Sequence, residues 1–253
     1  MAEMHSLLPM ALASFPGSGN TWTRYLIEAA TGVFTGSVYR DQGLMSKGFY
    51  GEFEAQSCGC TLLMKTHGYT LGSTPSPKQR LVEVARHGRR AVLLVRNPYE
   101  AFLAYRNFMK GGHLRYAPDS YFSGSGWNSY VTQKATLWRN FNIDWVNLTT
   151  SVHVIHYEDL KQDPVREIRD FLRFIGLPED EERLNCVTMN HDGQFKRKAS
   201  NQVFNKRDVF TPALHAQLDA AIDALQAQLL ARRLRPMPLA RYKYYRTSTA
   251  TGN

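Results

Sequence analysis

A glycine-rich turn near the start of the chain constrains the fold more than any other stretch. An apolar run, Met10 to Phe15, leads into Pro16-Gly17-Ser18-Gly19, and helix-type spacing of apolar residues then extends from Thr21 to Ala30, with Gly32 as a stop. When a strand leads through such a turn into a helix, the first N–H groups of the helix have no backbone partner and lie at the positive end of the helix dipole. The turn therefore predicts a cradle for a phosphate or sulfate ester. The alternative is an ordinary strand-to-helix turn that uses glycine for its geometry.

The turn differs from the Walker A loop at one position that matters for chemistry. Asn20 stands where that loop has its lysine. Nucleoside triphosphate hydrolysis would therefore lack its main cation.

Apolar strands alternate with helices along the rest of the chain. After the first strand and helix, we expect strands at Thr61–Gly68, Arg90–Val95 and Val152–His156, and helices at 77–87, 99–110, 129–148, 163–176 and 211–230. This alternation predicts an α/β fold, a P-loop-type parallel β-sheet flanked by helices, in a single domain covering residues 1–253. The polar, aromatic stretches 31–60 and 111–128 are expected to be loops near the binding cleft.

Basic residues follow two of these strands. Lys65 and His67 lie at the end of one strand and Arg96 at the end of another. Ligands bind at the carboxyl edge of open parallel sheets, which makes all three candidates. Taken alone, His67 also fits a hydrogen-bonded loop histidine and Lys65 a solvated strand end. The basic segment 190–208 fits either an anion clamp or a solvated loop, and the tyrosine-rich tail 236–246 is expected to lie across the surface.

Charge and cysteine content narrow the class of partner. The net charge of +9 favours anionic partners, and without a nucleic-acid-binding signature we expect a phosphorylated cofactor and no nucleic acid. Three cysteines, Cys58, Cys60 and Cys186, are interpreted as structural thiols. The segment 7–15 is too short to span a bilayer, so we expect no membrane segment and, as the chain stands, a cytoplasmic protein.

Several motifs in one order resemble the sulfotransferases that use 3′-phosphoadenosine 5′-phosphosulfate (PAPS). The run from Phe15 to Trp22 looks like the 5′-phosphosulfate loop of that family, Lys65-Thr66-His67 like its catalytic strand end, and Arg96-Asn97-Pro98 like its 3′-phosphate element. Tyr157 begins a segment similar to the family's strand-to-helix turn, and Phe195-Lys196-Arg197-Lys198 resembles its nucleotide clamp. The residues around the first loop are similar to those of the WSC-domain sulfotransferase branch.

This resemblance implies a sulfotransferase fold and a role for each motif. His67 would accept the proton of the acceptor hydroxyl, and Lys65 would neutralise the leaving phosphate oxygens. PAPS would be the co-substrate, with adenosine 3′,5′-bisphosphate (PAP) as product and no metal. The implied nucleotide-binding residues are Gly17, Ser18, Gly19, Asn20, Thr21, Trp22, Arg96, Tyr157, Phe195, Arg197 and Lys198.

The chain departs from the pattern of cytosolic relatives at three positions. Gly17 replaces a lysine of the phosphosulfate loop, Ala104 replaces a serine, and Ala199 replaces the last glycine of the clamp. The missing cation must come from elsewhere, and Lys65 is the first candidate, with Arg24 as the alternative.

The function that we expect is sulfuryl transfer to an acceptor hydroxyl, on a small molecule or an anionic glycan, with a carbohydrate favoured. The WSC-type resemblance implies sialylated carbohydrate, whereas the aromatic loops would also suit a phenol or steroid. The alternatives are a nucleotide kinase of related architecture and a non-catalytic nucleotide- or glycan-binding module. The resemblance also implies the Golgi lumen if the chain is a catalytic fragment. It leaves the oligomeric state open.

Overall fold

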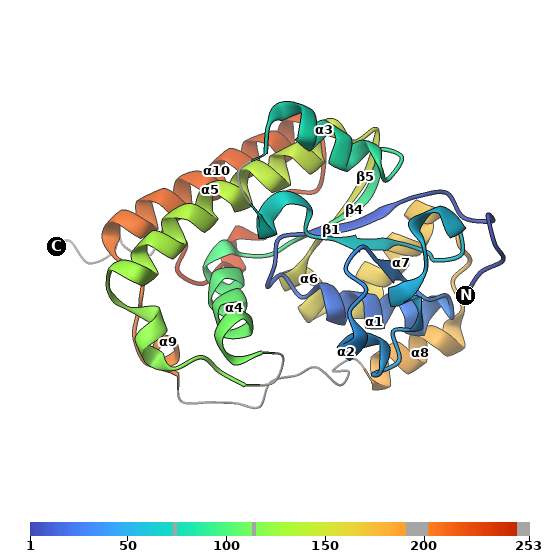
Figure 1. The fold of residues 1–253 in the computed structure, drawn as a ribbon, viewed down its shortest axis with the longest axis horizontal. Coiled ribbons are helices and arrows are strands. Elements are labelled where there is room, and N and C mark those ends of the chain that lie inside the picture. Colours follow the sequence, from blue (N-terminus) through green and yellow to red (C-terminus); the bar gives the residue numbers. More distant parts are fainter. Residues whose placement is uncertain (73–74, 113–114, 191–201, 247–253) are drawn as a thin grey trace.

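Five parallel strands form the centre of the molecule (Figure 1). The computed structural model describes residues 1–72, 75–112, 115–190 and 202–246. The strand order is β2-β3-β1-β4-β5, with bounds β1 Ala11–Ser14, β2 Gly36–Ser37, β3 Met64–Thr66, β4 Arg90–Val95 and β5 Ser151–His156. After β1 the chain forms β2 and β3 on one side of β1 and then crosses to form β4 and β5 on the other side, so the order of the strands reverses at β1. Open sheets bind ligands at such a switch point.

Helices cover both faces of the sheet (Figure 1). Their bounds are α1 Asn20–Thr31, α2 Gln42–Met45, α3 Pro77–Ala85, α4 Pro98–Gly111, α5 Gly124–Leu148, α6 Tyr157–Gln162, α7 Pro164–Ile175, α8 Glu181–Met189, α9 Val203–Lys206 and α10 Pro212–Ala231. The prediction of a parallel α/β sheet is confirmed. The two-residue strand β2 and the helices α2, α6, α8 and α9 were not predicted, and α5 begins earlier in the chain than expected.

The two hydrophobic cores follow the alternation of side chains along the strands. Ala11 and Ala13 of β1 face a cluster built with α4, α5 and α10, whereas Leu12 faces a cluster built with α1, α7 and α8. Because neighbouring residues of a strand point to opposite faces, both layers share the same backbone. This double burial fixes β1, and β1 in turn fixes the turn that follows it.

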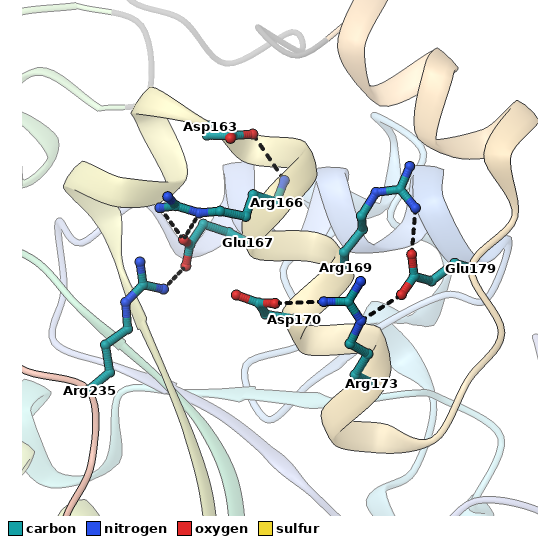
Figure 2. Close-up of polar contacts among 8 residues, drawn as sticks. All are labelled: Asp163, Arg166, Glu167, Arg169, Asp170, Arg173, Glu179 and Arg235. Atoms are coloured by element: carbon teal, nitrogen blue, oxygen red, sulfur yellow. Dashed lines mark hydrogen bonds and ion pairs between the residues drawn. The ribbon is translucent and has the colours of Figure 1, made fainter.

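Side-chain caps and glycines set the ends of α7. Asp163 accepts a hydrogen bond from the Arg166 N–H at 3.0 Å, Pro164 occupies the first turn, and Gly176 ends the helix at φ 74°. These are the signals on which the prediction of this helix rested. Ion pairs around α7 join Arg166 and Arg235 to Glu167 (Figure 2).

The C-terminal segment differs from its prediction. Met237, Tyr242 and Tyr244 are buried in the core beside α4 and α10, so the tail does not simply lie across the surface. Burial of these apolar and aromatic side chains stabilises the tail in the core, even though basic residues stand between them. Within the described residues, none of the helices is long and apolar enough to cross a membrane.

Candidate functional site

The turn between β1 and α1 brings backbone close to two other elements. Gly17 has φ 84°, and a Cβ there would lie 2.3 Å from the Ala101 carbonyl oxygen of α4. Gly19 has φ 94°, and its Cβ would lie 2.6 Å from the Tyr157 ring of α6. Among the residues that the structure describes, no side chain caps α1, and the first turn of the helix holds no acidic residue. The turn therefore leaves the positive end of the helix dipole open to an anion.

Polar atoms of this turn, and of Arg96 at the end of β4, lack partners among the described residues. Ser18 Oγ, Asn20 Oδ1 and Arg96 Nε are buried without a hydrogen bond. The Asn20 amide donates to the Leu12 carbonyl at 3.3 Å and to Ser14 Oγ at 3.0 Å, which ties the start of α1 to β1. Buried polar groups left unsatisfied are costly, and a phosphate ester would supply acceptors for the hydroxyl and the guanidinium. The residues present thus fit a phosphorylated ligand.

Aromatic and basic side chains line the α6 side of the turn. The Arg96 guanidinium lies 4.1 Å from the centre of the Tyr157 ring and donates from Nη1 to the Gly17 carbonyl at 2.8 Å. Trp22 meets Tyr157 edge to face, with ring centres 5.7 Å apart. Thr21 and Trp22 are half-buried in the first turn of α1. The sequence-predicted residues from three elements are therefore close to one another.

β3 delivers His67 to the other side of β1. Its Nδ1 lies 2.8 Å from the Ser14 carbonyl oxygen, and because a carbonyl only accepts, Nδ1 carries the proton. Burial, with the nearby Lys65 charge, lowers the pKa of His67 to about 3, so the ring is neutral at physiological pH. The Tyr39 ring stacks on it at 5.5 Å, and the Tyr39 hydroxyl accepts from the His67 N–H at 2.7 Å. A neutral ring with Nδ1 protonated has a free lone pair on Nε2, as a general base requires.

Lys65 is a buried cation at the same strand end. It pairs in register with Leu12 of β1, and its Nζ lies 5.7 Å from the centre of the Tyr39 ring. Burial and the Arg24 charge lower the pKa of Lys65 to about 8. No carboxylate of the described residues forms an ion pair with it. This ammonium is available for an anion at the end of β1 and β3.

Arg24, the alternative cation, has other partners. It is fully buried, it bonds to Glu52 and it donates from Nε to Thr35 Oγ1 at 2.6 Å. The Phe49 ring covers its guanidinium at 4.7 Å. Arg24 thus holds the 31–60 segment onto α1.

The remaining predicted nucleotide contacts lie outside the described residues. Phe195, Arg197 and Lys198 belong to the segment 191–201, so the clamp stays a prediction. The interpretation of Cys58 and Cys60 as thiols is wrong, because a disulfide joins them. With Glu54 they form a group with potential metal ligands, but these sulfurs are bonded to each other.

Three further residues of the site region, Tyr39, Glu158 and Lys134, were not predicted from the sequence. Tyr39 lies in the predicted loop, but nothing in its surroundings marked it for contact with His67. Glu158 follows Tyr157 and accepts from the Asn97 N–H at 2.9 Å, while burial raises the pKa of its carboxyl to about 7. Lys134 lies on the buried face of α5. Its apolar neighbours three and four residues away are the signal that could have found it.

The parallel five-stranded sheet, with the glycine turn at its switch point and helices on both faces, is the architecture of the sulfotransferase fold. The family model of the sulfotransferase domain matches residues 9–231, and the chain belongs to this family. The structure of mouse sulfotransferase SULT7A1 complexed with PAP superposes with a TM-score of 0.56 at 16% identity, covering 92% of this chain and 88% of that one. At this identity the likeness shows the fold alone.

The curated relatives include WSCD family members. One from Drosophila pseudoobscura pseudoobscura is 41% identical over 83% of this chain and 63% of its own length. One from Aedes aegypti is 38% identical over 87% of this chain and 65% of its own. Sulfotransferase 1A1 of Canis lupus familiaris is 22% identical over 78% of this chain and 68% of its own. The chain thus spans less than two thirds of the length of these WSCD relatives, and the resemblance to that branch is confirmed.

Proposed function

We propose that the protein transfers a sulfuryl group from PAPS to a hydroxyl of an acceptor, and that the acceptor is a carbohydrate. The observation that carries the proposal is the hydrogen bond from His67 Nδ1 to the Ser14 carbonyl, which leaves Nε2 free beside Lys65 and the cradle. A base and a cation next to an anion-binding turn are the groups that such a transfer needs.

The reaction is an in-line displacement at sulfur. The acceptor oxygen forms a bond to sulfur, the bond from sulfur to the bridging phosphate oxygen breaks, and the acceptor proton goes to His67 Nε2. Lys65 stabilises the charge that develops on the leaving oxygen. Positioning and charge stabilisation dominate reactions of this kind.

The nucleotide lies across the turn in this proposal. Backbone N–H groups from Ser18 to Thr21 hold the 5′-phosphate, and Tyr157 with Trp22 encloses the adenine. Arg96 binds the 3′-phosphate together with Arg197 and Lys198 of the predicted clamp. The open first turn of α1 and the unpartnered Arg96 Nε support this placement.

Thermal denaturation with two nucleotides tests the nucleotide part of the proposal. PAP should raise the melting temperature strongly, because a ligand that binds only the native state stabilises it by about 2.7 kcal/mol at 100 times its Kd. 5′-AMP, which lacks the 3′-phosphate, should give a much smaller shift. If PAP and 5′-AMP raised the melting temperature equally, Arg96 would not bind a 3′-phosphate as proposed.

A screen of acceptors with radiolabelled PAPS tests the transfer itself. The net charge of +9 supports an anionic carbohydrate over a neutral phenol or steroid. Labelled product is expected from acidic oligosaccharides. Transfer to phenols or steroids alone would contradict the carbohydrate assignment and leave the sulfuryl transfer standing.

We also propose that the protein works in an oxidising compartment such as the Golgi lumen. The Cys58–Cys60 disulfide supports this, because disulfides persist there and are rare in the cytosol. Titration of the denatured, unreduced protein should find the single thiol of Cys186. Three thiols in protein from its native source would contradict the proposal.

A further inference from the structure

One lysine of α5 lies on the buried face of its helix. Lys134 is only 8% exposed, and its neighbours at helical spacing, Tyr130, Val131, Leu137 and Trp138, are all buried. Its Nζ donates to the Thr70 carbonyl at 3.4 Å, near the long limit for a hydrogen bond. No carboxylate of the described residues pairs with it. Lys134 is thus a buried cation without a protein counter-ion in the described part of the chain.

The position of this ammonium relates it to His67. Thr70 belongs to the turn that follows His67, because its N–H and its hydroxyl both donate to the His67 carbonyl, at 3.1 and 2.6 Å. The Lys134 Nζ also lies 5.5 Å from the centre of the Tyr105 ring of α4. Tyr105 borders Gly17, since a Cβ on Gly17 would lie 3.1 Å from the Tyr105 Cβ. Lys134 therefore lies between the turn after His67 and the helix beside the cradle.

The two sides of the cradle have different linings. Tyr157 borders Gly19 on the α6 side, and Arg96 stacks on the Tyr157 ring, where the nucleotide is proposed to bind. Tyr105 and Lys134 lie on the α4 and α5 side, next to the turn of His67. An acceptor must approach His67 from a side that the nucleotide leaves free. Lys134 is on that side.

The free-energy cost of burying the Lys134 ammonium group indicates that an anionic ligand binds to it. Burying an ammonium costs free energy unless a counter-charge or good hydrogen bonds offset it. One long bond to a carbonyl and one aromatic ring offset it poorly, and burial lowers the pKa of Lys134 accordingly. An anionic group brought by a ligand would offset this cost.

We propose that Lys134 binds a carboxylate of the acceptor and so selects acidic over neutral sugars. The inference rests on the proposed function, because it takes His67 as the group that the acceptor hydroxyl approaches. It assigns Lys134 as the residue that recognises the acidic group of the acceptor.

Equilibrium binding of matched sugars to the PAP-loaded protein tests this. The probes are methyl β-D-glucuronide against methyl β-D-glucoside, and 3′-sialyllactose against lactose, followed by calorimetry. The wild type should bind the acidic member of at least one pair about 10- to 100-fold more tightly, the scale of one hydrogen bond between charged groups. Lys134→Met should remove that preference and leave the neutral member unchanged, whereas Lys134→Arg should retain most of it.

Arg139→Met is the matched control, since it removes one positive charge from an exposed position of the same helix. It should keep the preference. Equal binding of acidic and neutral members by the wild type would overturn the proposal. So would a Lys134→Met protein that weakens both members alike, or an Arg139→Met protein that loses the preference. The comparison is repeated without PAP, so a failure to bind PAP would count against the proposed function and leave the test of Lys134 intact.

Discussion

Gly17 shows how a single residue removes a cation from the site. The backbone has φ 84° there, and the Ala101 carbonyl occupies the place of a side chain. A lysine of the cytosolic type cannot fit at this position while α4 packs as it does. The charge must therefore come from another element, and the buried Lys65 is the cation at the strand end beside it.

Gly17→Lys is expected to destabilise the fold rather than improve the site. A positive φ costs about 1–2 kcal/mol for a residue with a Cβ, and overpacking against α4 adds about 1–3 kcal/mol. Denaturation by urea measures the loss. Gly48→Lys is the matched control, because Gly48 has φ 98° and no atom of the described residues lies within 4 Å of its Cβ position. If both variants lose the same stability, the steric account of Gly17 is wrong.

The residues of the site were predictable to different degrees. The cradle and the pair Lys65 and His67 were visible because each follows an apolar run at a strand end. The pairing of Arg24 with Glu52 was not, since the two are 28 residues apart and only the folded loop brings them together. The same holds for Tyr39 against His67.

At the scale of elements, α6 joins three parts of the molecule through consecutive residues. Tyr157 packs on Arg96 and Gly19, Glu158 accepts from the Asn97 N–H at the start of α4, and Asp159 pairs with Arg235 at 2.8 Å and with Arg241. One short helix thereby connects the cradle, the end of β4 and the C-terminal tail. Glu158 Oε2 is buried without a partner among the described residues.

Glu158 is expected to make the stability of the ligand-free protein depend on pH. Burial raises its pKa from 4.5 to about 7, so between these values the folded state holds a proton that the unfolded state has released. The contribution of this carboxyl to the free energy of unfolding is therefore largest below about pH 4.5. It falls by up to about 3 kcal/mol as the pH rises to about 7. Glu158→Gln should lose this slope and be the more stable protein at pH 8.

Urea denaturation from pH 5 to pH 8 measures the effect. Glu182→Gln, at an exposed position of α8, is the control and should follow the wild type. Parallel stability curves for the wild type and Glu158→Gln would show that this carboxyl is ionised in the fold.

Elements were predictable where the chain itself carries their signals. The long apolar strands, and α7 with its Asp163 cap and Gly176 stop, are of this kind. β2 has only two residues, Gly36 and Ser37, and exists because β3 offers them a register with Met64 and Lys65. No local pattern could have shown it.

At the scale of the whole molecule, the C-terminal tail, residues 235–246, connects elements that are far apart in the sequence. Arg235 forms an ion pair with Glu167 of α7 at 2.6 Å (Figure 2). It forms a second ion pair with Asp159 of α6. The Lys243 carbonyl accepts from the Asn97 side chain at 2.9 Å. The last described residues thus contact the same elements that support the nucleotide side of the cradle.

Arg235→Met should lower the free energy of unfolding by about 1–3 kcal/mol. Glu167 is fully buried, and loss of Arg235 leaves it with Arg166 as its one ion-pair partner among the described residues. Removing one partner of a buried pair costs up to about 3–5 kcal/mol, reduced here because Arg235 is a third exposed. Arg233→Met, at an exposed position two residues earlier, should change little. Equal effects of the two variants in urea denaturation would contradict this role of the tail.

The rate of sulfuryl transfer from labelled PAPS by the wild type and by His67→Ala tests the central claim most directly. At pH 7 His67 is neutral, and its loss as general base should lower turnover by about 10²–10⁴-fold while PAP affinity stays nearly unchanged. A His67→Ala protein that transfers at a rate close to that of the wild type would contradict the account, because another group would then accept the proton.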